Sequence, residues 1–215
     1  MNALFRGLHV LSVTLWFGSG VFFTLMGVLL FQSFAEVSRL PAKERPLWLP
    51  MQPAYDQPSP GPGFPDPLRL EQGSRAAGVA VARILPVYYG LQTGCGLVAL
   101  LTALILARGT EGGAHKWRSG LAALALLTAL AGWWLEGEVS RLREPRNTLT
   151  DALLTTTSPP AEQVEGARLA RATFGTWHGY SLIQNFTTLF LVTGLTLLVP
   201  SLCRGPSGRE SYPHH

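Results

Sequence analysis

Polar side chains are rare inside the apolar stretches of this chain, so each one that occurs there is a candidate for chemistry. His9 follows Leu8 close to the start of an uncharged segment. A histidine in that position can be an axial ligand of a b-type haem, although a hydrogen bond to a neighbouring helix is the more common role of such a side chain. We expect no bound cofactor, and haem b on His9 is the alternative.

A second set of polar residues falls near the opposite ends of the expected helices. If neighbouring helices run antiparallel, these residues come to one level at the membrane boundary. The members of this candidate polar cluster are Arg83, Gln92, Glu136, Glu138, His178 and Asn185. An ion pair from Arg83 to Glu136 or Glu138, with the imidazole nearby, would lower the cost of placing charge there. The structural alternative is that the charged groups extend to the surface and that His178 and Asn185 only link helices.

Neither histidine supports a metal site. His9 and His178 are expected on opposite sides of the membrane, and at about 1.5 Å of rise per residue the gap between them is roughly 20 Å or more. They cannot ligate one metal ion or one haem within a single chain. The sequence has no pattern typical of nucleotide binding, metal binding or catalysis, so it favours a protein that is not an enzyme.

Four uncharged segments must position these side chains. No Asp, Glu, Lys or Arg occurs in residues 7–35, 84–107, 119–135 and 172–203. About 20 apolar residues of helix cross a bilayer core that is roughly 30 Å thick. The predicted fold is therefore an all-α polytopic membrane protein, an antiparallel bundle of four transmembrane helices within residues 1–205. The expected spans are about 7–33, 80–107, 118–143 and 168–201, and residues 206–215 are expected to form a flexible tail.

The connection between the first two spans has a different composition. It holds nine of the sixteen prolines, and repeated prolines remove backbone donors and favour an extended chain. We expect an extramembrane loop over residues 36–75, which could dock a partner in an extended form. After the third span, apolar residues at helical spacing extend the helix outside the lipid until Pro145, and Pro159 and Pro160 precede the next helix.

Small and aromatic residues predict how the helices meet each other and the lipid. Small residues let helix backbones approach closely, and the candidates are two pairs four residues apart, Gly90 with Gly94 and Gly175 with Gly179, together with the run Gly18-Ser19-Gly20. Tryptophans near the ends of spans are typical interfacial anchors. Those expected to act in this way are Trp16, Trp117, Trp133, Trp134 and Trp177.

The charge distribution favours lipid over nucleic acid as the partner of the basic residues. The net charge is +4, and the cations flank the helices. Basic residues are densest near the N-terminus, the connection at 108–118 and the tail, so both termini are expected in the cytoplasm of a protein of the plasma (inner) membrane. A homo-oligomer or a larger membrane complex is the expected assembly.

Three local patterns occur in one order along the chain. They are Leu8-His9 followed by Leu15-Trp16-Phe17-Gly18, then Ile84-Leu85-Pro86-Val87-Tyr88-Tyr89, then Phe174-Gly175-Thr176-Trp177-His178-Gly179 with Ser181 and Asn185. Together with residues 136–147, they resemble the family of human transmembrane protein 205 and its bacterial relatives over all four spans. The resemblance implies a four-helix membrane domain and supplies no catalytic residues. The first span is also similar to those of copper-resistance membrane proteins and of haem-binding protoporphyrinogen oxidases.

Two interpretations of function follow. The first is a non-enzymatic membrane protein that handles a small solute or metal, or that scaffolds a membrane complex. The second is a haem-binding membrane redox protein or electron-carrying subunit that uses His9. Four helices with few charges leave little room for an aqueous path, so transport would require a homo-oligomer.

Overall fold

The computed structural model describes residues 2–41, 43–108 and 113–202. Four long helices dominate this part of the chain: α1 (Asn2–Arg39), α2 (Arg69–Ala107), α3 (Gly113–Thr155) and α4 (Ala161–Leu197). Two short 3-10 helices, η1 (Pro53–Asp56) and η2 (Val199–Leu202), lie in the first connection and after α4. No strand occurs among the described residues, so the prediction of an all-α bundle is confirmed.

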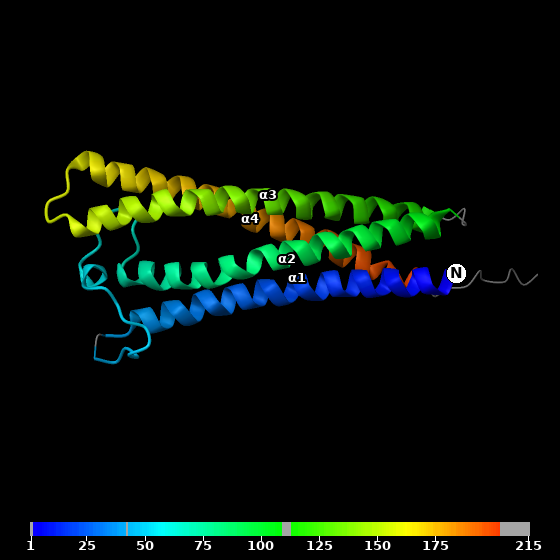
Figure 1. The fold of residues 1–215 in the computed structure, drawn as a ribbon, viewed down its shortest axis with the longest axis horizontal. Coiled ribbons are helices and arrows are strands. Elements are labelled where there is room, and N and C mark those ends of the chain that lie inside the picture. Colours follow the sequence, from blue (N-terminus) through cyan, green and yellow to red (C-terminus); the bar gives the residue numbers. More distant parts are fainter. Residues whose placement is uncertain (1, 42, 109–112, 203–215) are drawn as a thin grey trace, which may run out of the picture.

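The bundle consists of two helix pairs. α1 packs along α2 and α3 packs along α4, while α2 and α3 join the two pairs and α1 also meets α4. Figure 1 shows the four helices running nearly parallel to one long axis, with the N-terminus at one end and the first connection folded over the other end. We call the end that carries this connection, together with the adjoining turns of the helices, the head.

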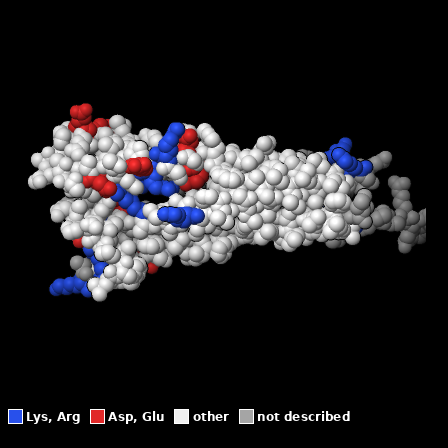
Figure 2. All heavy atoms as spheres, viewed as in Figure 1, with Lys and Arg blue, Asp and Glu red and all other residues white. Residues whose placement is uncertain are grey.

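Charge divides the molecule along its length. Figure 2 shows acidic and basic side chains gathered at the head, then a broad uncharged zone, then a few basic side chains at the far end. The shortest uncharged segment, residues 119–135, has 135 − 119 + 1 = 17 residues, or about 25 Å of helix at ~1.5 Å per residue. This length is close to that of a bilayer core, so the uncharged zone is the part suited to lipid.

Three helices are long and apolar enough to cross a membrane, namely Ala3–Arg39, Arg69–Ala107 and Lys116–Thr155. Their length and composition indicate a membrane protein. α4 lies beside α3 but carries Gln184, Asn185 and several threonines, which lower its mean hydropathy. The hydroxyls of Thr187, Thr193 and Thr196 each donate to the carbonyl four residues earlier, so their polarity is satisfied within the helix.

The centre of the uncharged zone is filled by side chains. Val13 and Trp16 of α1 pack with small residues of α2 and α3 and with Val192 and Leu195 of α4. Trp16 is only 1% exposed and its indole donates to the Gln92 side chain, so the prediction that Trp16 anchors at the interface was wrong. By contrast, Trp117 is 72% exposed near the far end of α3, as an interfacial anchor should be.

Close helix approach occurs at other glycines than the spacing predicted. A Cβ added at Gly90, Gly94, Gly175 or Gly179 would meet nothing within 4 Å. Of the glycines that were named from spacing, Gly20 does lie against another helix, where a Cβ would be 3.3 Å from the Leu189 side chain. The tightest approaches are at Gly73, Gly96 and Gly132. Four-residue spacing shows that a helix can approach a neighbour, but it does not show which face has one.

The ends of the helices also differ from the prediction. α1 continues to Arg39 and α2 begins at Arg69, so the first connection is shorter than the expected 36–75. α3 does not end at Pro145 but continues to Thr155. Pro145 is exposed, so the carbonyl that it leaves without a donor can reach water, and the turns beyond it are held by contacts to α2. The expected tail, 206–215, lies outside the described residues.

Replacement of Gly73 by alanine should destabilise the contact between α1 and α2. A Cβ there would lie 2.7 Å from the backbone carbonyl oxygen of Phe34, and it would also collide with the Ser38 side chain. Because a backbone atom cannot move aside cheaply, Gly73→Ala should cost at least about 1 kcal/mol, measured by thermal unfolding in one detergent. The matched control is Gly78→Ala on the same helix, where nothing lies within 4 Å. Equal unfolding midpoints for the two variants would contradict the close approach.

Candidate functional site

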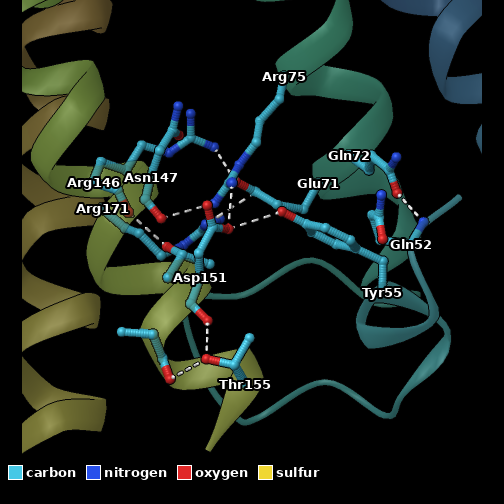
Figure 3. A network of polar contacts seen from close by, with 12 residues as sticks. Gln52, Tyr55, Glu71, Gln72, Arg75, Arg146, Asn147, Asp151, Thr155 and Arg171 are labelled. Carbon is cyan, nitrogen blue, oxygen red and sulfur yellow. Dashed lines mark hydrogen bonds and ion pairs between the residues drawn. The ribbon is translucent and has the colours of Figure 1, made fainter.

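The head is organised around the carboxylate of Glu71, which lies in the first turn of α2. This side chain is only 2% exposed, and it receives arginines from three helices. Arg75 of α2 lies 3.0 Å from Oε1 and Arg171 of α4 lies 2.9 Å from Oε2, while Arg146 of α3 donates to Oε1. Figure 3 shows these groups converging between the helices. A single carboxylate therefore ties α2, α3 and α4 together.

A second set of contacts links this cluster to the first connection. The Arg75 guanidinium reaches Asp151 of α3 at 2.6 Å, and the Tyr55 hydroxyl of η1 donates to the same carboxylate at 3.1 Å. Arg171 donates to the Gly63 carbonyl at 2.9 Å and lies over the ring of Phe64, 4.7 Å from its centroid. The connection is thus fixed on the head by the same arginines that bind Glu71.

The arginines control the ionisation of Glu71. This residue lies outside the zone suited to lipid, because it precedes Ile84, the first residue of the uncharged segment 84–107, by 84 − 71 = 13 residues. Burial alone would raise the pKa of this carboxyl, but the charges of Arg146, Arg171 and Arg75 outweigh burial and lower the pKa below its ordinary value. Burial also raises the pKa of Tyr55 to about 12. Both groups therefore keep one charge state through the neutral range.

A cavity of about 140 Å³ lies where the head meets the uncharged zone, and we call it the boundary cavity. Residues from all four helices line it. Its polar lining comes from Arg75, Glu136, Arg143, Arg146, Asn147 and His178, and its apolar lining includes Phe31, Leu85 and Phe174. The His178 ring stacks on Phe174, with 5.8 Å between ring centroids. Figure 2 shows the charged surface of the head hollowed where basic and acidic side chains meet.

The structure brings together two members of the predicted polar cluster, Glu136 and His178, both of which line the boundary cavity. The predicted ion pair of Arg83 is not formed among the described residues. Glu136 pairs with Arg143 at 3.4 Å and Glu138 pairs with Arg141 at 2.5 Å, both along α3. Partners on the same helix are within reach without any tertiary contact, which leaves Arg83 exposed on α2.

The two amides of the predicted cluster lie deeper and apart from His178. Gln92 donates to the Ser19 hydroxyl at 3.1 Å and accepts from the Trp16 indole, which joins α2 to α1. Asn185 accepts from the Tyr88 hydroxyl at 2.7 Å and donates to Thr24 at 3.3 Å, which joins α4 to α2 and α1. Both amides link helices inside the uncharged zone.

His9 lies at the other end of the bundle. Its side chain is fully buried, and Nδ1 lies 2.9 Å from the Thr102 hydroxyl and 3.1 Å from the Ala99 carbonyl. Nε2 is buried and has no hydrogen-bond partner among the described residues. The distance between the two histidines follows from their neighbours on α2. His9 contacts Ala99, and His178 lines a cavity with Gly78. These two residues of α2 are 99 − 78 = 21 positions apart, so the histidines are separated by about 30 Å along the bundle.

Metal ligands do not gather in the described part of the chain. Within it, no group of three or more His, Cys, Asp or Glu side chains is placed to hold a metal ion. Three of the four charged side chains around the boundary cavity are arginines, which repel cations, and the fourth is the carboxylate of Glu136. This arrangement is suited to an anion.

Residues 69–147 match a family model that is described as a domain of unknown function (DUF4149). The match includes α2 and α3 as far as Asn147, and therefore Glu71, Arg75, Glu136 and Arg146. No curated protein and no solved structure matches the chain. The similarity thus covers the two central helices of the bundle and carries no assigned activity.

Sequence reasoning missed the Glu71 cluster. The spacing of Glu71 and Arg75 is that of an ordinary pair four residues apart on an exposed helix. The signal that could have identified it is the placement of Arg171, which directly precedes the uncharged segment 172–203, together with Arg146 in the charged stretch after the third segment. That signal was hidden because α3 was expected to stop at Pro145.

Removal of the Glu71 charge should unfold the head. Glu71→Gln leaves three arginines close together without their common anion, and breaking a buried ion pair by removing one partner costs about 3–5 kcal/mol. The thermal unfolding midpoint in detergent should fall strongly. The control is Glu165→Gln, which removes an exposed carboxylate paired only with Arg168 and should leave the midpoint unchanged. Equal midpoints for the two variants would show that Glu71 does not hold the helices.

The same carboxylate predicts the dependence of stability on acid. Because the pKa of folded Glu71 lies below the ordinary 4.5, its contribution to stability is present above pH 4.5 and is lost as the pH falls toward the folded pKa. The unfolding midpoint of the wild type should therefore drop between pH 5 and lower pH by more than that of Glu71→Gln, measured in one buffer series at fixed ionic strength. Parallel curves would assign acid sensitivity to other carboxylates.

Proposed function

We propose that the chain crosses a bilayer four times, α4 included, and acts without catalysis by binding a small anionic solute in the boundary cavity. The observation that carries this proposal is the lining of the cavity at the membrane boundary, where arginines outnumber the carboxylate. Glu136 is the one acidic side chain of the lining, against Arg75, Arg143 and Arg146. Arg75 and Arg146 also pair with Glu71, which they share with Arg171, so their positive charge is only partly neutralised and an anion would offset the remainder.

The apolar part of the lining favours a solute that also has a hydrocarbon portion. Phe31, Val79 and Leu85 face the cavity from the side of the uncharged zone, while the guanidinium groups approach from the head. A small carboxylate satisfies both surfaces, since its charged group can accept two hydrogen bonds from an arginine fork. A metal cation would meet mainly positive side chains there.

The packed centre of the bundle argues against passage of the solute through one chain. Trp16, Val13 and Val192 fill the middle of the uncharged zone. The proposal is therefore binding or handover at the head side, and passage would require a homo-oligomer with a path between chains.

Two further parts of the proposal concern family and placement. We propose that the chain is related to the transmembrane protein 205-like family, supported by the order of the sequence patterns in α1, α2 and α4. We also propose that it lies in the plasma (inner) membrane with both termini in the cytoplasm, supported by the basic residues at the end opposite the head. The head and its cavities would then face away from the cytoplasm.

Filling the boundary cavity should abolish solute binding. Gly78 lines the cavity and a Cβ there meets nothing within 4 Å, so Gly78→Leu places a side chain in the cavity without a backbone clash. We expect one of the monocarboxylates from formate to butyrate, at fixed ionic strength, to raise the unfolding midpoint of the wild type but not that of Gly78→Leu. Gly90→Leu is the control, because Gly90 lies on the same helix in open space outside the cavity.

A scaffold would give the opposite pattern. No carboxylate would shift the unfolding midpoint of the wild type or of either variant. Partner subunits would co-purify from the native membrane at fixed stoichiometry, and deletion of residues 46–67 would remove them. That outcome would replace solute binding with complex assembly.

The second candidate function is haem binding by His9, because its Nε2 is a buried nitrogen without a partner among the described residues. Haem would supply one-electron chemistry there. Nδ1 is held by Thr102 and Ala99, which leaves Nε2 as the nitrogen that could act as a ligand. Since the ring is fully buried, Nε2 can be reached only if α1 moves away from its neighbours.

An absorption spectrum separates the two candidates. The anionic-solute proposal expects a colourless protein after purification in detergent from its own membrane. A haem protein would show a Soret band near unit stoichiometry that shifts on reduction with dithionite and is lost in His9→Ala. His178→Ala is the control, since that imidazole lies at the other end of the bundle and its loss should leave such a band intact.

A further inference from the structure

A second cavity lies on the outer side of Arg146, and we call it the head cavity. Its volume is about 350 Å³. The lining comes from the first connection and from α3 and α4, and its polar side chains are Arg146, Arg168 and Arg171. Ala172, Phe174 and Gly175 of α4 complete the lining, with Pro62 and Gly63 of the first connection. No acidic side chain is part of this lining.

The three guanidinium groups have donors to spare. Each guanidinium carries five N–H donors. Contacts within the described residues occupy Nη2 of Arg146, Nε and Nη1 of Arg171, and Nε and Nη2 of Arg168. The carboxylates that they use are Glu71, which is shared with Arg75, and the exposed Glu165. Arg168 is thus paired one to one, whereas Arg146 and Arg171 share one carboxylate with Arg75, so the positive charge around the cavity is only partly neutralised.

The level of the head cavity matches that of lipid phosphates. Ala172, which lines it, is the first residue of the uncharged segment of α4, whereas Arg168 and Arg171 lie in the turn just outside. Headgroup phosphates occupy this narrow zone between hydrocarbon and water. A phosphate reaching the cavity, from lipid or from solution, would meet arginines from two helices.

We propose that the head cavity binds a phosphate group, carried by a phosphate ester. Three guanidinium groups around one cavity suit the several equivalent oxygens and the charge of a phosphate better than those of a carboxylate, because paired N–H donors match paired phosphate oxygens. The cavity is also larger than the boundary cavity, as an esterified phosphate requires. This inference rests on the proposed membrane topology but not on the solute in the boundary cavity.

Arg168 is the residue that distinguishes a binding site from a structural cluster. Arg146 and Arg171 are both bound to Glu71, so their presence is explained by the fold. Arg168 takes no part in that cluster, and its side chain is 47% exposed beside Glu165 on the same helix. Its remaining N–H donors give the cavity a third cation that the Glu71 cluster does not use.

Two variants test the site without disturbing Glu71. Gly175→Leu should fill the head cavity, because Gly175 lines it and a Cβ there meets nothing within 4 Å. Arg168→Gln removes one guanidinium that the fold does not need. Gly166→Leu is the matched control, since Gly166 lies on the same helix in open space and outside the cavity lining.

The measurement is calorimetric titration of the full chain in a phosphate-free maltoside detergent. One arm uses glycerol 3-phosphate and the other uses dihexanoyl phosphatidic acid, with acetate at equal ionic strength as the reference anion. We expect saturable binding of at least one phosphate ester to the wild type and to Gly166→Leu, weakened about tenfold or more by Gly175→Leu and by Arg168→Gln. Binding of the soluble ester identifies a free phosphate ester as the source, and binding of the lipid alone identifies a headgroup.

The inference is overturned if neither ester binds saturably, or if Gly175→Leu binds as tightly as Gly166→Leu. Loss of phosphate binding in Gly78→Leu, with Gly175→Leu unaffected, would also overturn it, because the phosphate would then occupy the boundary cavity. In that case the boundary cavity would still be an anion site and the proposed function would stand. Failure of the carboxylate experiment with success of this one would reject the proposed solute and retain the phosphate site.

Discussion

The carboxylate of Glu71 fixes the relative placement of three helices, because its two oxygens receive guanidinium groups from α2, α3 and α4. It also fixes the rotation of α2. Residues two apart on a helix point about 200° away from each other. With Glu71 directed at α3 and α4, Gly73 is directed at α1, where the helix backbones are closest. One buried charge thus sets both the polar and the close-packed face of the head.

Several features of the sequence that break local rules follow from this constraint. α3 continues past Pro145 because Arg146 and Asp151, just beyond it, contact Glu71 and Arg75. These contacts hold the turns beyond Pro145 in place although proline removes one backbone hydrogen bond from the helix. The proline-rich connection is held on the head through Tyr55 and the Gly63 carbonyl, which bind partners of the same cluster. Tertiary contacts therefore decide where these elements end.

Sequence alone was sufficient for the four helices, since uncharged segments about as long as a bilayer core is thick have few alternatives to a membrane-spanning helix. It was insufficient for the head. Glu71 lies in a charged stretch that resembles a solvated helix start, and its partners Arg146 and Arg171 lie 75 and 100 residues away along the chain (146 − 71 and 171 − 71). His178 and Glu136 were placed at one level correctly because depth follows from residue counting, whereas the partner of Arg83 depended on side-chain directions that counting does not give.

The distribution of unused hydrogen-bonding capacity explains why binding belongs at the head. Within the uncharged zone, the amides of Gln92 and Asn185 are bound to Trp16, Ser19, Tyr88 and Thr24, so they have little to offer a solute. In the head, one buried carboxylate is shared by three arginines that also line two cavities, with Arg146 lining both. A bilayer would penalise such partly neutralised charge, and water would weaken its attraction for an anion. The boundary between the two is where arginines can stay charged and still bind an anion strongly.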